Sequence, residues 1–509
     1  MAQHEATIPS QQTGAASAHA APSADSNPYD LSPSLYNKDL APTTRKGRTW
    51  SAYSIFTLWA NDVHSLGNYA FAIGLFALGM SAGQIFIALL VGAVLLFGLL
   101  NLSGFMGEKT GVPFPVMSRI AFGIRGAQIP ALVRGAVAIA WFGIQTYLAS
   151  MVLQVMILAV APGAASMTTG KFLGLSSLGW ISFLVLWAIQ LVIVSYGMEM
   201  IRKYEAFAGP VILVTFAALA IWVFMQAGGS IALSTGNPPT GVKGWVDVLG
   251  SASLWVAIYG TFVLNFCDFT RSAKSKKAIV RGNFIGIPLN MAFFGLIVVV
   301  LAGGSFKING AVISSPSDVV AAIPNTALLL LASLSLLILT IAVNLMANFV
   351  APVYALTNLF PKKLNFRSAA IISGVIGLII LPWNLYDSPE VITYFLGGLG
   401  ALLGPLFGII MADYWLIRRA QVHVPDLYRV SADGSYQYTR GVNYRAVIAL
   451  AISAVGALVI AFVPAFSAAH PFAWFIGCAL GAIAYLALAD RKPTFIDMDG
   501  EAIAVAPTH

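Results

Sequence analysis

The chain has 509 residues, of which 58% are hydrophobic and only 9% are charged. A soluble protein carries about a quarter charged residues, so the composition excludes a soluble protein and indicates a polytopic membrane protein. The net charge of +8 is spread along the chain in a way that follows membrane sidedness, so we expect no nucleic-acid partner.

Both ends of the chain are expected to be cytoplasmic tails. Residues 1–48 are rich in Ala, Ser, Pro and Gln, and no basic start is followed by an apolar core. This composition predicts a disordered tail rather than a signal peptide or a folded domain. Residues 491–509 form the second tail. Cys267 and Cys478 lie in or beside apolar segments without metal-ligand spacing, which predicts buried free thiols.

Twelve apolar runs between the tails are long enough to cross a hydrocarbon core of ~30 Å. They lie at about 52–79, 83–105, 129–161, 179–197, 206–227, 247–267, 284–303, 325–351, 368–385, 391–414, 444–464 and 471–489. The third and eighth runs are long, which implies tilt or extension beyond the membrane. The fold class is therefore all-α, with twelve transmembrane helices.

Lysine and arginine alternate strongly between the two sides of these spans. Twenty-five lie in the tails and in every second loop, including Arg134, Arg491 and Lys492, whereas the opposite loops hold only Lys171, Lys243 and Lys307. Because cytoplasmic loops are enriched in basic residues, this alternation predicts a multi-pass protein of the cell membrane with both termini in the cytoplasm.

The first span contains the most polar stretch inside an apolar run, WANDVHSLGNY from Trp59 to Tyr69. It holds Asn61, Asp62, His64 and Asn68. A charged side chain at bilayer depth costs at least ~2.5–3.5 kcal/mol, so it persists mainly where it faces protein or water. Asp62 and His64 are two apart and do not share a helix face. They act together only if the helix unwinds, and we predict a break at Ser65–Gly67.

The sixth span shows the same pattern, with Gly260 near its middle and Asn265 and Asp268 toward its cytoplasmic end. Interrupted helices five spans apart have opposite orientations, which is typical of an inverted repeat. We expect residues 49–227 to form the first repeat (helices 1–5) and residues 245–419 the second (helices 6–10). Residues 420–490 then hold a cytoplasmic loop and helices 11 and 12. The glycine-rich run at 397–408 favours close helix packing.

Three pairs of side chains spaced four apart share a helix face. They are Trp141 and Gln145 in helix 3, Trp255 and Tyr259 in helix 6, and Asn344 and Asn348 in helix 8. An amide offers a donor and an acceptor together and matches the NH–C=O edge of a lactam, and an aromatic face stacks on a flat ring. These pairs also allow roles other than ligand binding. The tryptophans could serve in packing or as interface anchors, and the amides could form hydrogen bonds between helices.

Ionisable groups within the spans allow two interpretations. Asp62 and His64 carry a coupling proton, or His64 is a buried histidine whose hydrogen bonds are satisfied. The sequence shows no phosphate loop, catalytic triad or metal cluster, so we expect neither an enzyme nor a cofactor.

With these residues in view, the sequence is similar to the nucleobase–cation symporter family, which includes permeases for cytosine, uracil, allantoin, hydantoins and thiamine. The most specific stretch runs from Gly111 to Thr146 and matches the family at Pro113, Arg119, Gly123, Gly126, Pro130, Arg134, Trp141, Gly143 and Gln145. Asn265–Ser275 resembles the segment after helix 6, with Cys267 where proline is usual, and Pro405–Arg419 resembles the end of helix 10.

The resemblance implies the five-plus-five inverted repeat of leucine-transporter-type proteins, two extra helices, and alternating access around a mid-membrane site. It also implies that Trp141 stacks on the substrate ring, Gln145 bonds the ring edge and Asn348 binds substrate. Tyr259 should be the helix 6 aromatic, with Trp255 as the fallback. Asn344, one turn before Asn348, is a further candidate.

One departure from the family bears on the coupling cation. In sodium-coupled relatives, carbonyls of helix 1 and hydroxyls of helix 8 hold the ion. The carbonyls match Asn61 and His64, but the hydroxyl positions match Ala342 and Val343, which have none. Because hard cations require several oxygen ligands, proton coupling through Asp62 and His64 is favoured over sodium.

The sequence therefore predicts a secondary transporter that imports a small planar nitrogen heterocycle, such as a purine, a pyrimidine, a hydantoin or an allantoin-like compound, by cation symport. Its partners are this substrate, a proton or sodium ion, and the lipid bilayer. Import of urocanate, thiamine or a B6 vitamer, and uncoupled facilitation, are the alternatives. A membrane enzyme is disfavoured because Asp62 and His64 are the chief ionisable groups within the spans.

Overall fold

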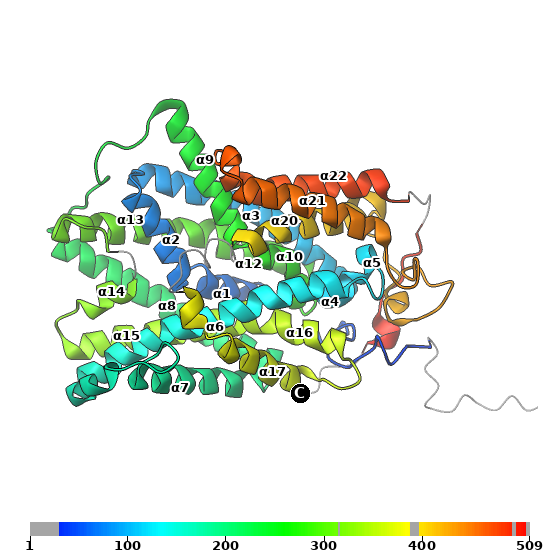
Figure 1. Ribbon diagram of the computed structural model, residues 1–509, viewed down its shortest axis with the longest axis horizontal. Coiled ribbons are helices and arrows are strands. Elements are labelled where there is room, and N and C mark those ends of the chain that lie inside the picture. The colour runs from blue at the N-terminus through cyan, green and yellow to red at the C-terminus, as the bar shows by residue number, and fades with distance from the viewer. Residues whose placement is uncertain (1–29, 314–315, 387–396, 491–494, 505–509) are drawn as a thin grey trace, which may run out of the picture.

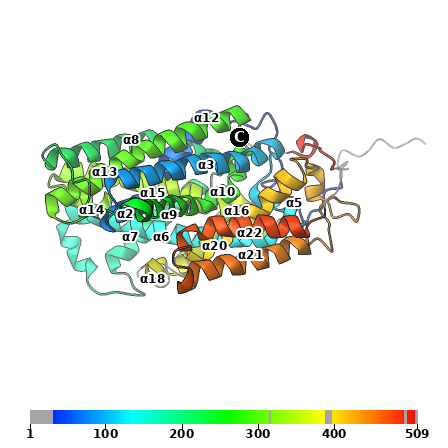
Figure 2. The ribbon, with the colours of Figure 1, turned by 90° about the horizontal axis from the view of Figure 1, so that it is seen from above.

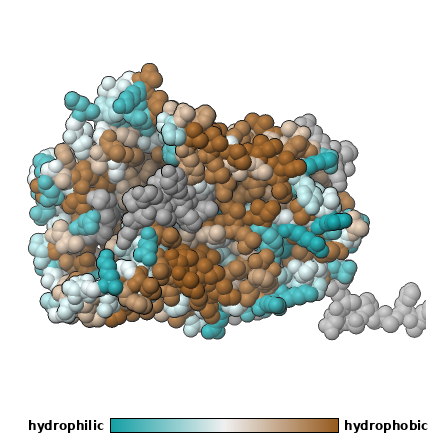
Figure 3. Space-filling model, viewed as in Figure 1, coloured by the Kyte–Doolittle hydropathy of each residue, from teal (hydrophilic) through white to brown (hydrophobic). Residues whose placement is uncertain are grey.

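The structure is a computed structural model that describes residues 30–313, 316–386, 397–490 and 495–504. Within these ranges the chain is helical, with isolated β-bridges and no strand. Most helices run along the long axis of the molecule (Figure 1). Hydrophobic side chains predominate over the middle of the face shown in Figure 3, and hydrophilic ones gather toward its two ends, as a bilayer requires.

The residues predicted to form the first repeat contain six longer helices. These are α1 (Ala52–Asp62) with α2 (Leu66–Ala77), α3 (Ala82–Thr110), α6 (Gln128–Val160), α7 (Ser177–Val194) and α8 (Met198–Gln226). Three short helices lie between them, α4 (Phe114–Met117), α5 (Arg119–Phe122) and η1 (Pro162–Thr168).

The remaining helices follow in chain order. They are α9 (Gly241–Ile258), α10 (Gly260–Asn265), α11 (Cys267–Thr270), α12 (Lys276–Phe284), η2 (Ile285–Leu289), α13 (Asn290–Asn309), α14 (Pro316–Ala321), α15 (Thr326–Asn344), η3 (Leu345–Phe349), α16 (Val350–Leu359), α17 (Phe366–Ile379), α18 (Pro382–Tyr386), α20 (Gly397–Met411), η5 (Ala412–Ile417), η6 (Val424–Tyr428), α21 (Tyr444–Phe462), η7 (Pro464–Phe466), η8 (His470–Phe472), α22 (Ala473–Leu488) and η9 (Glu501–Ile503). In this part of the chain, η2, η3 and η5 are π-helical turns within longer helices.

Nine helices in the described ranges are long and apolar enough to cross a membrane. The predicted spans outside these nine are the first, the sixth and the ninth. The first and sixth are each divided into two pieces, and the ninth is the 14-residue helix α17. Part of the predicted tenth span, residues 391–396, lies outside the description. The arrangement of twelve spans stays a prediction.

Both breaks predicted from the sequence are present, and the first is shifted by two residues. Helix α1 ends at Asp62, and Ser65 begins α2 by accepting a hydrogen bond from the Asn68 N–H. The interruption therefore covers residues 63–65, and Gly67 lies inside α2. In the sixth span, Tyr259 separates α9 from α10. A Cβ on Gly260 would lie 2.5 Å from the Trp474 indole nitrogen, so this position requires glycine.

The C-terminal helices pack through the glycine-rich run that the sequence assigned to close packing. Helices α20, α21 and α22 lie side by side along one edge of the bundle (Figures 1 and 2). Gly404 and Gly408 of α20 lie directly against the backbone of α22 at Trp474 and Cys478. Any side chain at these glycines would collide with that backbone, so the sequence specifies the contact.

The disorder predicted for the N-terminal tail is wrong for residues 30–48, while residues 1–29 lie outside the description. Leu35 and Leu40 are buried against the ends of the helices. The Arg271 guanidinium donates to the Asp39 and Ala41 carbonyls, and the Thr43 N–H donates to the Gly111 carbonyl. The apolar residues of this segment bury enough surface to offset the conformational entropy that the chain loses on ordering. The overall composition of the tail did not reveal this burial.

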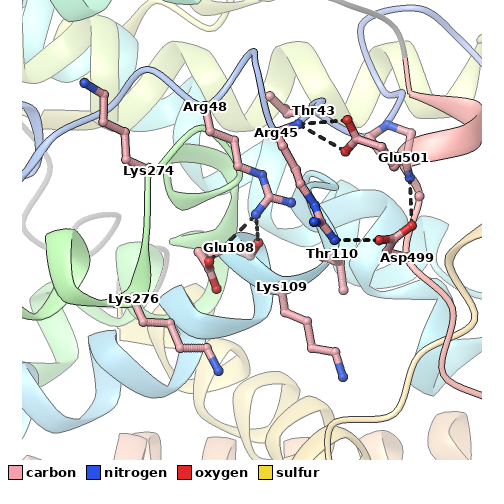
Figure 4. A pocket seen from close by; sticks show the side chains of 12 residues that line it. Thr43, Arg45, Arg48, Glu108, Lys109, Thr110, Lys274, Lys276, Asp499 and Glu501 are labelled. Carbon is pink, nitrogen blue, oxygen red and sulfur yellow. Dashed lines mark hydrogen bonds and ion pairs between the residues drawn. The ribbon is translucent and has the colours of Figure 1, made fainter.

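Residues 495–504 of the C-terminal tail are also ordered, and they meet the N-terminal segment at a cavity of about 520 Å³ (Figure 4). The Arg45 guanidinium contacts the Asp499 carboxylate at 3.0 Å, and the Arg45 backbone N–H donates to the Glu501 carboxylate. Lys109 pairs with Asp497 at 2.9 Å. Partial burial opposes the charge on Asp497, but the Val422 N–H and the Lys109 ammonium outweigh it and lower the pKa of this carboxyl. Arg491 and Lys492 lie outside the described residues.

Arg134 is not a loop residue, as its place in the basic alternation implied. It lies in α6 with 1% of its surface exposed. Its guanidinium donates to the Thr261 carbonyl, to Asn265 Oδ1 and to the Ala347 carbonyl. It therefore ties the third span to the second half of the sixth and to the middle of the eighth.

Candidate functional site

A cavity of about 530 Å³ lies where the two interrupted helices meet. Its walls come from both broken spans, from α6, from the eighth span, and from α20, α21, η8 and α22. The lining residues are Asp62, Ser65, Gly67, Asn68, Phe71, Val137, Trp141, Gln145, Leu254, Ala257, Ile258, Thr261, Phe262, Val343, Ala347, Asn348, Gly400, Ala401, Leu403, Ala461, His470, Pro471, Ala473 and Trp474. Such an apolar cavity with a few polar groups is the usual form of a small-molecule site.

Trp141 and Gln145, one turn apart on α6, both line this cavity. Gln145 is 6% exposed, and its Oε1 is buried without a hydrogen-bond partner among the described residues. Its amide lies beside Gly67 of the broken first span, where a Cβ would be 3.8 Å from Nε2. A buried unpaired acceptor costs about 1–3 kcal/mol, so a ligand N–H at this atom would recover that free energy.

Asn348 lines the cavity. Asn344 lies behind the cavity wall and holds the Asn348 side chain in place. Asn348 Nδ2 donates to Asn344 Oδ1 at 2.8 Å. Asn344 Nδ2 in turn donates to Gln190 Oε1 at 2.7 Å and to Thr146 Oγ1 at 3.0 Å. Of the two asparagines predicted to bind substrate, Asn348 therefore faces the cavity and Asn344 orients Asn348. Gln190 and Thr146 complete the network, and the sequence analysis missed them because neither belongs to a spaced polar pair.

Replacing Asn344 by alanine is expected to weaken ligand binding by about tenfold, although Asn344 does not line the cavity. The substitution removes the acceptor that fixes the amide of Asn348 and leaves Gln190 Oε1 unpaired. Isothermal titration with a planar nitrogen heterocycle of the class that the sequence predicts measures the change. Ser453→Ala is the control, because Ser453 is also buried but lies in α21 away from the cavity and bonds only its own helix. Equal affinities of the two variants would contradict this role.

Tyr259, the expected helix 6 aromatic, and Trp255, its fallback, are not among the residues that line the cavity. Tyr259 is 1% exposed, and its hydroxyl accepts a hydrogen bond from Asn68 Nδ2 at 2.9 Å. Asn68 also donates to the Asp62 carbonyl at 2.8 Å. Tyr259 therefore links the unwound part of the first span to the break in the sixth. Trp255 is fully buried and stacks on Phe71.

His64 is fully buried and lies away from the cavity. Its Nε2 contacts Asn290 Oδ1 at 3.1 Å and its Nδ1 contacts the Tyr69 hydroxyl at 2.7 Å. Because an amide oxygen only accepts, Nε2 carries the ring proton and Tyr69 donates to Nδ1. Both nitrogens of a neutral imidazole are thus satisfied. The ring also packs against Phe216 and Phe294. This geometry favours the structural interpretation of His64.

Asp62 and Asn61 point to different environments, although they are neighbours. Asp62 lines the cavity. Asn61 lies behind it, and its Nδ2 donates to the Thr57 carbonyl at 2.7 Å and to Glu205 Oε2. Glu205 of α8 is 2% exposed and forms no ion pair with any described residue, and its Oε1 is buried without a partner. Asn61 Oδ1 is also buried and has no hydrogen-bond partner in the described part of the chain.

Glu205 was missed because hydropathy places it one residue before the fifth span. The close approach of α8 to α1 buries it. A Cβ on Gly209, one turn later in α8, would lie 3.4 Å from the Ala60 Cβ. An isolated ionised carboxylate is very unfavourable in such surroundings, so a proton or another cation accompanies this group when it is buried.

Trp474 was also missed, because helix 12 lies outside the predicted repeat. It lines the cavity with 2% of its surface exposed, and its indole nitrogen is buried without a hydrogen-bond partner among the residues that the structure describes. A tryptophan near a helix end resembles an interface anchor in sequence, so spacing carried no signal of this position.

Comparison with known proteins identifies the family. Residues 42–477 match the model for permeases of cytosine/purines, uracil, thiamine and allantoin. The chain belongs to this family. It is 35% identical to an allantoin permease of Bacillus subtilis, over 90% of this chain and 94% of that protein. It is also 36% identical to a purine-uracil permease of Arabidopsis thaliana, over 84% of this chain and 71% of that protein.

Solved structures agree on the fold. The structure of Mhp1, a nucleobase-cation-symport-1 family transporter, in a closed conformation with bromovinylhydantoin bound, aligns with a TM-score of 0.74 at 24% identity, covering 89% of this chain and 95% of Mhp1. A Na⁺-coupled sialic acid symporter aligns with a TM-score of 0.57 at 11% identity, covering 91% and 96%. The resemblance to nucleobase–cation symporters is thus confirmed. The chain is a polytopic membrane transporter of this permease family and not an enzyme.

Proposed function

We propose that this permease imports a small planar nitrogen heterocycle of the nucleobase, hydantoin or allantoin type. The observation that carries the proposal is the cavity between the broken helices, which presents Trp141, the unpaired Gln145 Oε1 and Asn348 together. The Trp141 indole stacks on the ring, Gln145 accepts a ring N–H, and Asn348, oriented by Asn344, bonds the ring edge. Relatives that transport allantoin and purines support the same substrate class.

We propose alternating access in a five-plus-five inverted repeat, with helices 1–5 in residues 49–227 and helices 6–10 in residues 245–419. The Asn68–Tyr259 hydrogen bond at 2.9 Å supports this, because it couples the two breaks directly. Tyr259 serves here as a link between the broken helices, and Trp255 supports it by packing. The basic alternation of the loops supports cytoplasmic termini and a position in the cell membrane, which we include in the proposal.

The coupling cation we propose is the proton. Ala342 and Val343 offer no side-chain oxygen at the positions expected to complete a sodium site. The buried carboxyl of Glu205, with Asn61 beside it and Asp62 on the cavity wall, supplies groups that a proton can neutralise. Asp62 therefore stays a candidate for the proton site, and Glu205 joins it in place of His64.

A thermal-shift screen tests the substrate class. Allantoin, hydantoin, uracil, cytosine, adenine, urocanate, thiamine and pyridoxine are added to the purified protein in detergent. A ligand that binds only the folded state raises stability by mass action, and at 100-fold excess over its Kd the gain is about 2.7 kcal/mol. We expect stabilisation by one or more of the first five compounds. Stabilisation by urocanate, thiamine or pyridoxine alone would contradict the proposed substrate class.

A further inference from the structure

The N-terminal end of α22 reaches the wall of the candidate substrate cavity. Figures 1 and 2 show α22 beside α20 and α21 at the edge of the bundle, yet Ala473 and Trp474 line the cavity. Helix 12 is outside the two predicted repeats, so nothing in the repeat arrangement anticipates a contribution from it.

The Trp474 indole is held in one position by its surroundings. Its ring packs against Phe407 of α20, with centroids 5.7 Å apart. On another side it contacts the backbone at Gly260, where a Cβ would lie 2.5 Å from Nε1. The backbone carbonyl of Trp474 is in turn packed against Gly404. The glycine at the break in the sixth span therefore makes room for this indole.

Two polar side-chain atoms of the residues lining the cavity are buried and have no hydrogen-bond partner among the described residues. They are Oε1 of Gln145, which accepts, and Nε1 of Trp474, which only donates. Buried polar groups in native proteins are nearly always paired, with protein or with ordered water, so each unpaired one needs an explanation. A ligand with both a hydrogen-bond acceptor and an N–H could pair with these two atoms.

We propose that the indole N–H of Trp474 donates a hydrogen bond to an acceptor on the substrate, a carbonyl oxygen or an unprotonated ring nitrogen. This inference rests on the proposed function and narrows it. The substrate combines an N–H for Gln145 with an acceptor for Trp474, as a lactam or a ureide does. A fully N-substituted ring satisfies Trp474 and leaves Gln145 unpaired, so it binds more weakly.

The test is Trp474→Phe, which keeps an aromatic ring and removes the N–H. Trp415→Phe is the matched control, because the Trp415 indole nitrogen is also buried and unpaired but does not line the cavity. With hydantoin, allantoin and uracil as probes, we expect Trp474→Phe to raise the Kd by about tenfold and Trp415→Phe to leave it within about twofold. The melting temperature without ligand should be similar for both variants.

The wild-type protein gives a second, independent readout. With ¹⁵N-labelled tryptophan, saturation by the tightest of the three probes should move the Trp474 indole N–H resonance downfield and leave that of Trp415 in place. A role in packing alone predicts a lowered melting temperature for Trp474→Phe with an unchanged Kd and an unmoved resonance, and this would overturn the inference while the proposed function stands. Failure of the wild type to bind any probe would overturn both.

Discussion

Gln145→Ala is expected to raise the Kd for the transported heterocycle by about 10- to 100-fold, the effect of losing a hydrogen bond to a buried group at about 1–3 kcal/mol. Gln145 Oε1 has no partner among the described residues, so the ligand's N–H is its expected donor. Alanine removes that acceptor, and the ligand N–H is then desolvated without compensation. Equilibrium binding of radiolabelled ligand to the purified protein measures the change.

Two controls separate recognition from general damage. Gln154→Ala removes the same side chain from the same helix at a position that bonds only the Ser150 carbonyl and does not line the cavity. Lys171→Ala changes an exposed loop residue. Both should bind within about twofold of the wild type. If Gln145→Ala behaved as these controls do, Gln145 would not be part of the site.

Glu205→Gln is expected to abolish concentrative uptake driven by a pH gradient while leaving ligand binding in place. Glutamine resembles the protonated carboxyl permanently, so the carrier can no longer alternate between protonated and ionised states. Proteoliposomes with an acidic outside and a neutral inside should accumulate ligand with the wild type and reach only equilibration with the variant. Glu199→Gln is the matched control, because Glu199 lies on the same helix but is exposed and pairs with Arg202.

The same vesicles distinguish the coupling ions and the facilitator hypothesis. An imposed sodium gradient at equal pH should have little effect on the wild type, because Ala342 and Val343 lack hydroxyl groups. Strict sodium dependence would show that the assignment of helix 8 positions is wrong. Equilibration without accumulation under either gradient would indicate an uncoupled facilitator.

The spacing of polar residues named three of the side chains that line the candidate cavity, whereas other predicted residues do not line it. Trp141, Gln145 and Asn348 line the cavity, as expected for regular helices in which residues four apart share a face. Near the breaks, spacing alone does not say which face of each helix meets the cavity, and neighbouring residues on a helix point in different directions. Asn61, His64 and Tyr259 consequently turn into the protein, while their neighbours Asp62 and Ile258 reach the cavity.

Long-range packing accounts for what the sequence did not predict. The burial of Glu205 could not be predicted, because a hydropathy profile does not show that α1 covers the first turns of α8. Trp474 was missed because its contact with Gly260 joins residues more than 200 positions apart. The ordered N-terminal segment depends on pairings such as Arg271 with Ala41, which no local composition reveals.

A structure of the protein with its tightest heterocyclic ligand tests the central claim most directly. We predict the ligand in the cavity between the two broken helices, with its ring parallel to the Trp141 indole and an N–H within hydrogen-bond distance of Gln145 Oε1. A ligand bound elsewhere, with this cavity empty and Trp141 and Gln145 uncontacted, would contradict it.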